Sequence, residues 1–496
     1  MISRRTFLAA AGVAAGWPGI GWSQEPGKPR PKPEGVLVND IHSQLNTTRV
    51  FRIMEPDSVD AVRGALKLAR TENRSLCMAG GRHAMGGQQF ATDGVLIDIR
   101  KLDKVLAFDA ERGCIEVESG MQWTQLHGHL LSRQRGHRKP WTFAQKPVGA
   151  DLLTMGGCLS ANIHGRGLAL PPFIGDIESF KLMDANGDMH HCSRSDNPEL
   201  FRLAIGGYGL FGFIYSVTLR LVPRRKLERV VEVRSLDGLT GAFAERIGTG
   251  YLYGDFHCAI DPKSDDFLRR GIFSCDRPMA DNTRMQALRK APTEADQIEL
   301  MLLAHSDKHA AFELALSGQQ ASSGQAGWSD EQQMSPYPNN YHREIERRLG
   351  APKGSEMIGE FTCERGALEP FMGELRQYAL REQVEIVGCS MRLIDQDKES
   401  FLAWARKSCA CVSLHMHIEH STRGLIRAGD HFRRMIDISL RHGGSWYPTY
   451  HRHALRRQVD AAYPQFAEFL KLKRKYDPAE LFQSDWYRHF KNMFSR

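Results

Sequence analysis

The sequence predicts an α+β fold that is divided into more than one domain. Its 496 residues, 42% of them apolar, are sufficient for several hydrophobic cores. The first half combines amphipathic helices with short strands, and beyond residue 223 longer strands alternate with helices. No segment reaches the roughly 20 consecutive apolar residues that a membrane helix needs. A stable membrane span is therefore not expected.

Composition argues against two classes of site. Lys and Arg outnumber Asp and Glu by 66 to 58, which gives a net charge of +8, but there is no dense basic run and nucleic-acid binding is not expected. The 10 cysteines include no C-x-x-C motif, so neither a zinc ribbon nor a thioredoxin-like motif is predicted. We expect most of these cysteines to be buried thiols.

Residues 1–24 have the pattern of a targeting segment. The pair Arg4-Arg5 precedes a short, weakly apolar stretch. This start resembles the twin-arginine export signal of bacteria, which implies transport of the folded protein to the periplasm by the twin-arginine export machinery. The alternative is a chance Arg-Arg pair in an ordinary N-terminal tail. Residues 25–42 follow as a Pro-rich, charged linker.

The first element after the linker is an amphipathic helix that begins at Ser58, with apolar residues at helical spacing up to Ala69. A short strand over 75–79 runs into the glycine-rich loop 80–88. Its glycines allow positive φ angles and close approach of the backbone, so that successive N–H groups form a concave anion site suited to a pyrophosphate. The loop matches neither the Rossmann fingerprint nor the P-loop.

Further short elements follow in order. A strand is predicted over 94–98, a hairpin over 104–109 and 114–118, and a helix that begins at 120–123. Three more segments with glycines lie at 154–165, 175–180 and 206–214.

In this order and spacing, the segments resemble the flavin domain of the vanillyl-alcohol oxidase, or PCMH-type, FAD-binding family. The resemblance covers about residues 43–224 and implies a two-subdomain FAD-binding domain there. It also implies a substrate or cap domain with an antiparallel sheet over 225–440, and a C-terminal segment, 441–496, that returns to the FAD domain. The implied cofactor is FAD, and the residues implied to bind it are Gly80, Gly81, Arg82, His83, Ala84, Gly86, Gly157, Ser160, Asn162, His164, Gly165 and Ile214.

The resemblance also implies a covalent link between His83 and the flavin. A neutral imidazole nitrogen is the nucleophile that such a link needs. The alternative is that His83 only makes a hydrogen bond in the loop. A second, cysteinyl link at Cys158, which some relatives have, is not expected.

The middle of the chain is expected to carry the substrate. Strands are predicted over 230–233, 251–257, 356–362, 385–394 and 411–419, and the resemblance implies that they form an antiparallel sheet over the flavin ring. Residues 315–341, rich in Ser, Gly, Gln and Asn, predict a long surface loop.

The candidate catalytic residues are Arg392, His415, His417, Asp255 and His451. Arg392 falls where relatives that oxidise sugars and polyols place an arginine near flavin N5, but their Glu-x-Arg pattern has Ser390 at the Glu position here. His415 and His417 share one face of a strand. Glu419 lies on that face too and makes a metal site conceivable, but the resemblance implies a wall that works without a metal.

Two further candidates come from other segments. Asp255 alternates with Tyr253 and His257 on one strand face, where ordinary sheet residues are an equal alternative. The family places the histidine that corresponds to His451 near the flavin ring.

The expected function is that of an FAD-dependent oxidase or dehydrogenase. It would oxidise a CH–OH group of a small sugar, polyol or lactone by hydride transfer to flavin N5, and oxygen or an electron carrier would reoxidise the flavin. One alternative is amine oxidation in the manner of cytokinin dehydrogenase, with Asp255 as the base. Another is a flavin-fold binding protein without turnover.

Overall fold

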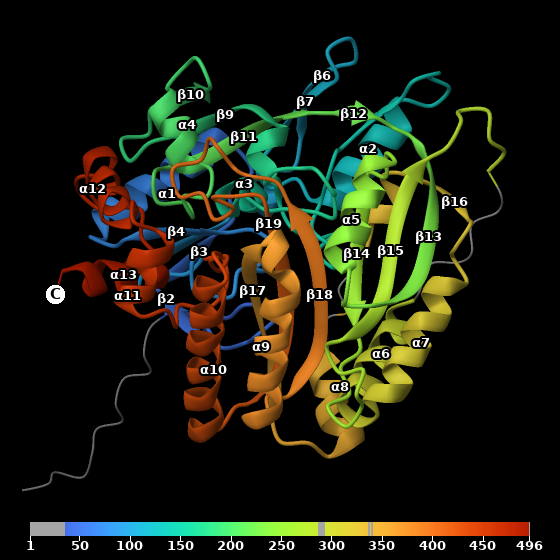
Figure 1. Ribbon diagram of the computed structural model, residues 1–496. Coiled ribbons are helices and arrows are strands. Elements are labelled where there is room, and N and C mark those ends of the chain that lie inside the picture. The colour runs from blue at the N-terminus through green and yellow to red at the C-terminus, as the bar shows by residue number, and fades with distance from the viewer. Residues whose placement is uncertain (1–34, 286–292, 336–337, 339–340, 496) are drawn as a thin grey trace, which may run out of the picture. The chain divides into compact units, whose positions relative to one another are not determined.

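The computed structural model describes residues 35–285, 293–335, 338 and 341–495 (Figure 1). The predicted export signal and the linker up to residue 34 lie outside the described residues. The end of the predicted linker is a strand, because β1 (Val36–Val38) pairs antiparallel with β2 (Thr48–Val50).

A small parallel sheet carries the glycine-rich loop. Its strands, in spatial order, are β3 (Arg52–Met54), β5 (Val95–Asp98) and β4 (Leu76–Ala79). Helix α1 (Val59–Thr71) begins as predicted, because the Ser58 side chain accepts a hydrogen bond from the backbone N–H of Ala61 at 3.3 Å. The buried face of α1 packs on this sheet. The glycine-rich loop leaves the sheet at the carboxyl end of β4.

An antiparallel sheet of five strands follows. Its strands, in spatial order, are β10 (Met189–Ser193), β9 (Ile177–Met183), β11 (Phe213–Arg220), β7 (Cys114–Glu118) and β6 (Val105–Asp109). The predicted hairpin is therefore present as β6 and β7. A two-stranded ladder of β8 (Trp141–Thr142) and β12 (Val222–Pro223) leads to the next sheet.

The largest sheet has seven antiparallel strands. In spatial order they are β16 (Ala326–Trp328), β13 (Lys226–Ser235), β15 (Arg270–Pro278), β14 (Tyr253–Cys258), β18 (Ile386–Ile394), β19 (Cys409–Glu419) and β17 (Gly354–Glu364). The antiparallel sheet predicted for the middle of the chain is present.

Helices connect these strands and cover the sheets. The other helices are α2 (Trp123–Arg133), α3 (Met155–Ala161), α4 (Pro198–Ala204), α5 (Leu239–Gly248), α6 (Glu294–Ser306), α7 (Lys308–Gln320), α8 (Tyr341–Leu349), α9 (Leu368–Arg381), α10 (Thr422–Arg441), α11 (Arg456–Ala462), α12 (Phe466–Tyr476) and α13 (Asp485–Phe494). The described residues therefore have the mixed α+β fold that the sequence predicts.

The two faces of the seven-stranded sheet have different neighbours. On one face Phe361 of β17 contacts Phe432 of α10, with ring centroids 5.1 Å apart, and α9 and α10 lie over this face in Figure 1. On the other face Ile358 and Glu360 line a cavity. The alternation of side chains along β17 thus separates a helix-packing face from a cavity face.

The end of the chain contacts the parallel sheet near its start. The backbone N–H of Leu76 in β4 donates to the carbonyl of Leu481 at 2.7 Å, and the N–H of Gln483 donates to the carbonyl of Leu76 at 2.9 Å. The side chain of Phe482 is buried in the core of α1 and this sheet. Residues about 400 positions apart in the sequence therefore share one core.

The prediction of a surface loop over 315–341 is wrong for three parts of that segment. Helix α7 extends to Gln320, β16 adds an edge strand, and a 3₁₀ turn covers Glu331–Gln333. Asp330 is fully buried and accepts hydrogen bonds from Arg224. The polar composition of this segment satisfies buried partners instead of solvating a loop.

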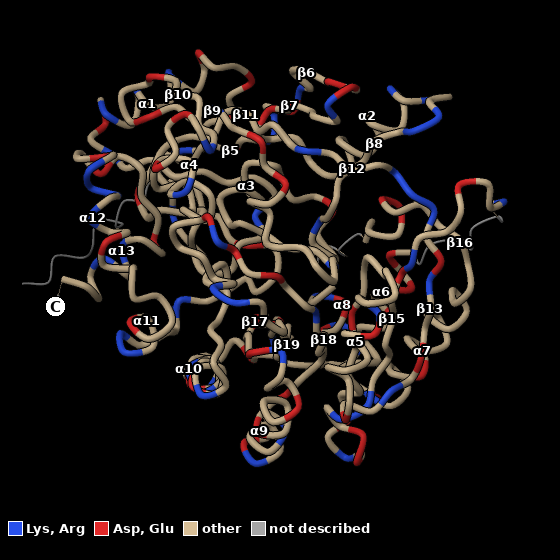
Figure 2. The backbone as a smooth tube through the Cα atoms, turned by 45° about the horizontal axis from the view of Figure 1, so that its top comes forward, with Lys and Arg blue, Asp and Glu red and all other residues tan. Residues whose placement is uncertain are grey.

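Charges and cysteines agree with the composition. Lys, Arg, Asp and Glu positions are interspersed along the chain in Figure 2. All the cysteines are buried free thiols, as expected. None of the described helices is both long and apolar enough to cross a bilayer.

Candidate active site

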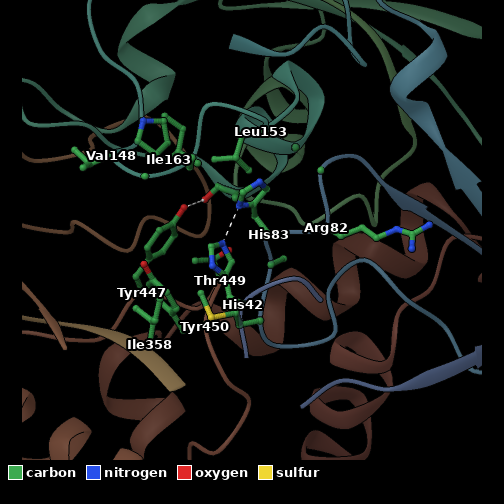
Figure 3. Close-up of a pocket in the computed structure, with 18 of the residues that line it drawn as sticks. His42, Arg82, His83, Val148, Leu153, Ile163, Ile358, Tyr447, Thr449 and Tyr450 are labelled. Carbon is green, nitrogen blue, oxygen red and sulfur yellow. Dashed lines mark hydrogen bonds between the residues drawn. The ribbon is translucent and has the colours of Figure 1, made fainter. Parts of the chain in front are cut away.

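A cavity of about 570 Å³ lies between the glycine-rich loop and the seven-stranded sheet, which is within the usual range for a cofactor or substrate site. It is lined by the loop at 80–84, by α3 and the segment after it, by the cavity face of β17, β18 and β19, and by residues 447–450. Figure 3 shows His83 and His42 facing each other in this cavity, with Tyr447 and Tyr450 nearby.

The glycine-rich loop is packed so closely that side chains have no room. A Cβ atom on Gly80 would lie 2.1 Å from Oγ1 of Thr154, and one on Gly81 would lie 2.4 Å from the carbonyl oxygen of Leu152. Both glycines line the cavity, so the loop presents its backbone there. Arg82 adopts a positive φ of 58° and points away from the other labelled residues in Figure 3.

His83 follows this loop and is buried. Its Nδ1 lies 2.8 Å from Nε2 of His42, and its Nε2 is buried without a hydrogen-bond partner in the described part of the chain. Burial, with the positive charge of Lys146 in addition, lowers the pKa of His83 to about 4. The ring is therefore a neutral imidazole at neutral pH and has one nitrogen without a partner.

The glycine-containing segment 154–165 contributes some of its residues to the cavity. Gly157, Ser160, His164 and, from β11, Ile214 line it, as Ala84 does from the first loop. Asn162 has a structural position instead: it ends α3 in the left-handed region, with φ 51°, donates to Asp397 at 2.8 Å and accepts from the N–H of Ile174 at 3.0 Å.

Gly86 and Gly165 also lie outside the cavity lining. A Cβ on Gly86 would meet the carbonyl oxygen of Tyr450 at 2.2 Å, and one on Gly165 would meet Cβ of Gln145 at 2.8 Å. Both glycines allow close packing behind the cavity wall.

Glu360 of β17 meets His164 at the cavity. The His164 Nε2 lies 2.8 Å from Oε2 of Glu360, and its Nδ1 lies 3.2 Å from the carbonyl oxygen of Gly165. A carbonyl can only accept, so Nδ1 carries a proton, and a second proton must lie between Nε2 and the carboxyl group. Burial alone would raise the pKa of Glu360, but the nearby charges of His164 and Arg392 outweigh it and lower the pKa.

Arg392 of β18 lies beside this pair. Its Nη1 is 4.0 Å from Oε1 of Glu360, and its Nε is buried without a hydrogen-bond partner among the described residues. Glu360 and Ser390 are both in register with Ser413 of β19, which lies between their strands. The pattern of relatives would place a carboxylate two residues before Arg392. Here Glu360 of β17 lies at the same level of the sheet as Ser390, which occupies that position.

His415 lines the cavity next to these groups. It is buried, and burial lowers its pKa to about 4, so that the imidazole is neutral. His417 on the same strand face does not line the cavity; its Nδ1 lies 3.8 Å from Oε1 of Glu356. Glu419, which the sequence placed on the same face, is exposed.

Asp255 and His451 lie outside the cavity lining. Asp255 is buried 3.1 Å from Nε of Arg166. Although burial raises the pKa of Asp255, the positive charge of Arg166 holds it well below its usual range. His451 packs against His453 with ring centroids 5.8 Å apart. Its neighbour Tyr450 lines the cavity instead.

Other predicted positions have different environments. His257 lines the cavity, whereas Tyr253 donates a hydrogen bond to the carbonyl of Ala144 at 2.7 Å. Cys158 is buried in the core, and burial raises the pKa of its thiol to about 12, which leaves it a poor nucleophile.

The sequence analysis missed Glu360, Tyr450 and His42. A signal for Glu360 exists, because Glu356 and Glu360 are the acidic residues inside a strand that is buried from Gly354 to Cys363. Buried carboxylates at even spacing on one strand face indicate a site. Tyr450 and His42 stand in irregular segments and carry no comparable pattern.

Comparisons with known proteins find an FAD-binding domain in the first half of the chain. A family model described as "FAD binding domain" matches residues 52–193. L-gulonolactone oxidase from Bos taurus is 33% identical over 175 residues, which are 35% of this chain and 38% of that protein. L-galactono-1,4-lactone dehydrogenase 2 from Oryza sativa is 29% identical over 206 residues, 40% of this chain and 34% of that protein.

A fungal relative gives a similar match. D-arabinono-1,4-lactone oxidase from Saccharomyces cerevisiae is 26% identical over 196 residues, 38% of this chain and 35% of that protein. The chain thus spans less than two fifths of the length of each of these relatives.

The residues present fit FAD. The glycine-rich loop presents its backbone to the cavity, and His83 Nε2 and Arg392 Nε are buried polar atoms without hydrogen-bond partners among the described residues. These are the groups that a large polar cofactor needs. Residues 52–193 therefore match an FAD-binding domain, and the cavity beside them fits FAD.

Proposed function

We propose that this protein is an FAD-dependent oxidoreductase that oxidises a CH–OH group of a lactone-type sugar derivative. The observation that carries the proposal is the group formed by Glu360, His164 and Arg392, which lines the same cavity as the glycine-rich loop. The relatives reported above are oxidases or dehydrogenases of aldonolactones by name.

Each of these side chains has a proposed part in the reaction. Bound FAD supplies the hydride acceptor. The guanidinium of Arg392 binds an oxygen of the substrate, and its buried Nε has a donor available. Glu360, held ionised, accepts the hydroxyl proton, and its hydrogen bond with His164 keeps that proton in the pair. The neutral His415 provides a further polar contact on the same wall.

The architecture supports the assignment of different functions to different domains of the chain. We propose that residues 43–224 form an FAD-binding domain of two subdomains, one around the parallel sheet and one around the five-stranded sheet. The seven-stranded sheet within 225–440 is then the substrate cap, and 441–496 returns to the FAD domain. The boundary after residue 224 fits the short connection between β12 and β13.

We also propose that His83 carries the flavin covalently and that the protein acts in the periplasm after twin-arginine export. The neutral, buried ring with an unpartnered Nε2 supports the covalent link. Arg4-Arg5 and the apolar stretch after it support export. Oxygen or an electron carrier would reoxidise the flavin.

Amine oxidation is less well supported by the site. The acidic base named for it, Asp255, is ion-paired with Arg166 and lies outside the cavity lining. A carboxylate outside the cavity lining cannot accept a proton from an amine bound in the cavity.

The test is anaerobic bleaching of the flavin spectrum with a substrate panel. The panel contains L-gulono-1,4-lactone, L-galactono-1,4-lactone, D-arabinono-1,4-lactone, open-chain alditols and an N-substituted adenine. We expect saturable bleaching by at least one lactone and slower bleaching by alditols. Bleaching by the substituted adenine alone would favour amine oxidation, and no bleaching by any compound would contradict the proposed function.

A further inference from the structure

A second polar cluster lies deeper on the cavity face of the large sheet. Glu356 of β17 is 3% exposed and stands four residues before Glu360, beyond Ile358. Three histidines surround its carboxylate: His305 from α6, His342 from α8 and His417 from β19. The proposed reaction uses none of these four residues.

When the His305 ring is neutral, one of its nitrogens points a lone pair at the Glu356 carboxylate. Its Nδ1 lies 2.8 Å from the carbonyl oxygen of Met301 and must donate to it, because a carbonyl only accepts. Its Nε2 lies 3.0 Å from Oε1 of Glu356. In a neutral His305, Nε2 is therefore a hydrogen-bond acceptor that faces a second acceptor, Oε1 of Glu356, at 3.0 Å.

His342 has the same arrangement on the other carboxylate oxygen. Its Nε2 donates to the carbonyl of His42 at 2.8 Å, and its Nδ1 lies 2.9 Å from Oε2 of Glu356. A histidine that binds a metal commonly donates its other ring N–H to a backbone carbonyl, which fixes the tautomer. His305 and His342 both show this arrangement.

His417 completes the cluster. Its Nδ1 lies 3.8 Å from Oε1 of Glu356, and the ring has space because residue 354 is glycine, where a Cβ would lie 2.5 Å from the His417 ring. The ligand atoms of His305, Glu356 and His417 all lie within 4.8 Å of one another.

The converging atoms need a positive charge between them. His305 Nε2, His417 Nδ1 and both oxygens of Glu356 are buried, and while these ring nitrogens carry no proton they make no hydrogen bond within the described part of the chain. Buried polar groups without partners are rare, so the cluster requires either a metal ion or protons on its rings.

We propose that His305, Glu356 and His417 bind a divalent transition-metal ion, with His342 beside the second oxygen of Glu356. Imidazole nitrogens with one carboxylate suit Zn²⁺ above all, and also Ni²⁺, Cu²⁺ or Fe²⁺. The His417 side chain is 22% exposed, which gives the ion a path from the surface.

The ion would hold α6, which lines one side of the substrate cavity, against the large sheet. It connects α6 and α8 to β17 and β19, and Gln297, Leu300 and Met301 of α6 line the cavity. His342 also holds the backbone of His42, whose ring contacts His83. The site is therefore structural, and its occupancy is independent of whether the proposed reaction is correct.

The experiment measures metal in the untagged, FAD-loaded protein by plasma mass spectrometry after gel filtration. We expect about one equivalent of metal per chain, or one saturable Zn²⁺ site after chelator treatment. His305→Ala, His417→Ala and Glu356→Gln should each weaken Zn²⁺ binding by more than about 100-fold, because loss of a ligand exceeds the effect of an outer-shell change. His342→Ala should weaken it less.

The matched control is His190→Ala, which removes a histidine 3.0 Å from Asp184 in an ordinary pair. It should leave metal content unchanged. Because a ligand variant could fail to fold, the visible spectrum of Co²⁺ bound to the wild-type protein is a second readout of nitrogen ligation. Absence of metal together with no saturable Zn²⁺, Co²⁺, Ni²⁺ or Cu²⁺ site would overturn the proposal, as would equal affinity in folded ligand variants. The cluster would then be a carboxylate shared by imidazolium rings.

Discussion

Glu360 and His164 come from different parts of the chain and are joined by one hydrogen bond of 2.8 Å. The carbonyl oxygen of Gly165 fixes a proton on the far nitrogen of the ring, so the near nitrogen faces the carboxylate with the shared proton. With its shared proton the pair carries no net charge, and Glu360 is held as a carboxylate until it gains a further proton. The pair is therefore suited to accept a hydroxyl proton during oxidation.

Glu360→Gln should lower the rate of flavin reduction by about 10²- to 10⁴-fold, the usual contribution of a general base, while FAD stays bound. Stopped-flow absorbance with a lactone substrate measures this rate. Glu364→Gln is the matched control, because Glu364 ends the same strand but is exposed. Since the pKa of Glu360 is lowered, the carboxylate loses its charge only when the pH falls below its ordinary value of 4.5. A wild-type rate limb between pH 5 and 8 that Glu360→Gln abolishes would contradict this assignment.

His83→Ala should remove the covalent link without unfolding the protein. Acid precipitation of wild type should leave the yellow flavin in the pellet, and in the variant the flavin should stay in the supernatant. In-gel flavin fluorescence gives the same comparison. Cys158→Ser is the control and should keep its flavin, because Cys158 lies in the core. Free flavin from wild type would show that His83 only lines the cavity.

At the scale of elements, the loop after β4 depends on how closely it meets the turn before α3. Gly80→Ala would place a Cβ 2.1 Å from Oγ1 of Thr154, so the loop must shift. We expect FAD occupancy of the purified variant to fall severalfold, measured as the ratio of flavin to protein absorbance. Gly64→Ala on α1 meets nothing within 4 Å and should keep full occupancy with equal or higher stability, by up to about 1 kcal/mol. Full occupancy in Gly80→Ala would show that the close packing of Gly80 against Thr154 is not needed for FAD binding.

Asp330 holds the segment that the sequence misassigned as a loop. Its carboxylate accepts from Arg224 at 2.8 Å and from Thr142 at 3.1 Å. Burial opposes the charge, but hydrogen bonds from His127 and Arg224 lower the pKa of Asp330 to about 2. A lowered pKa stabilises the fold above the unfolded value of about 4, and this contribution disappears as the pH falls towards 2.

Asp330→Asn should therefore destabilise the protein by about 2 kcal/mol more at pH 7 than near pH 2, the equivalent of the pKa shift. Urea unfolding at both pH values measures the difference. Asp237→Asn is a suitable control, because Asp237 is exposed near the start of α5. An equal loss of stability for Asp330→Asn at both pH values would mean that packing, not charge, holds the segment.

Alternation and capping were enough to predict α1, the β6–β7 hairpin and the long strands of the large sheet. They could not predict the strand order, and the site depends on it. Arg392 was found because it falls where relatives place an arginine, whereas the nearby carboxylate of Glu360 belongs to β17 and reaches the same level of the sheet only through the register with Ser413. Polar composition misled the reading of 315–341, because Asp330 and Gln333 satisfy buried partners there.

At the scale of the whole molecule, the cavity is assembled from segments that are distant in the sequence. The loop at 80–84, the segment 157–164, the strands β17 to β19 and residues 447–450 meet only after the chain has folded. The contacts between Leu76 and the last part of the chain add the same requirement. A cofactor can therefore occupy this cavity only in the folded chain.

This requirement leads to a prediction about export. A chain threaded unfolded across a membrane could not carry a bound FAD, whereas the twin-arginine route, which the Arg4-Arg5 start resembles, transports folded proteins. Replacing Arg4 and Arg5 by Lys should retain FAD-loaded protein in the cytoplasm of an expressing bacterium, measured by flavin fluorescence and immunoblot of fractionated cells. Lys28→Gln in the Pro-rich linker is the control and should reach the periplasm with wild type. Periplasmic protein from the double-Lys variant would mean that the arginine pair does not direct export, and that FAD is loaded by a route compatible with an unfolded chain.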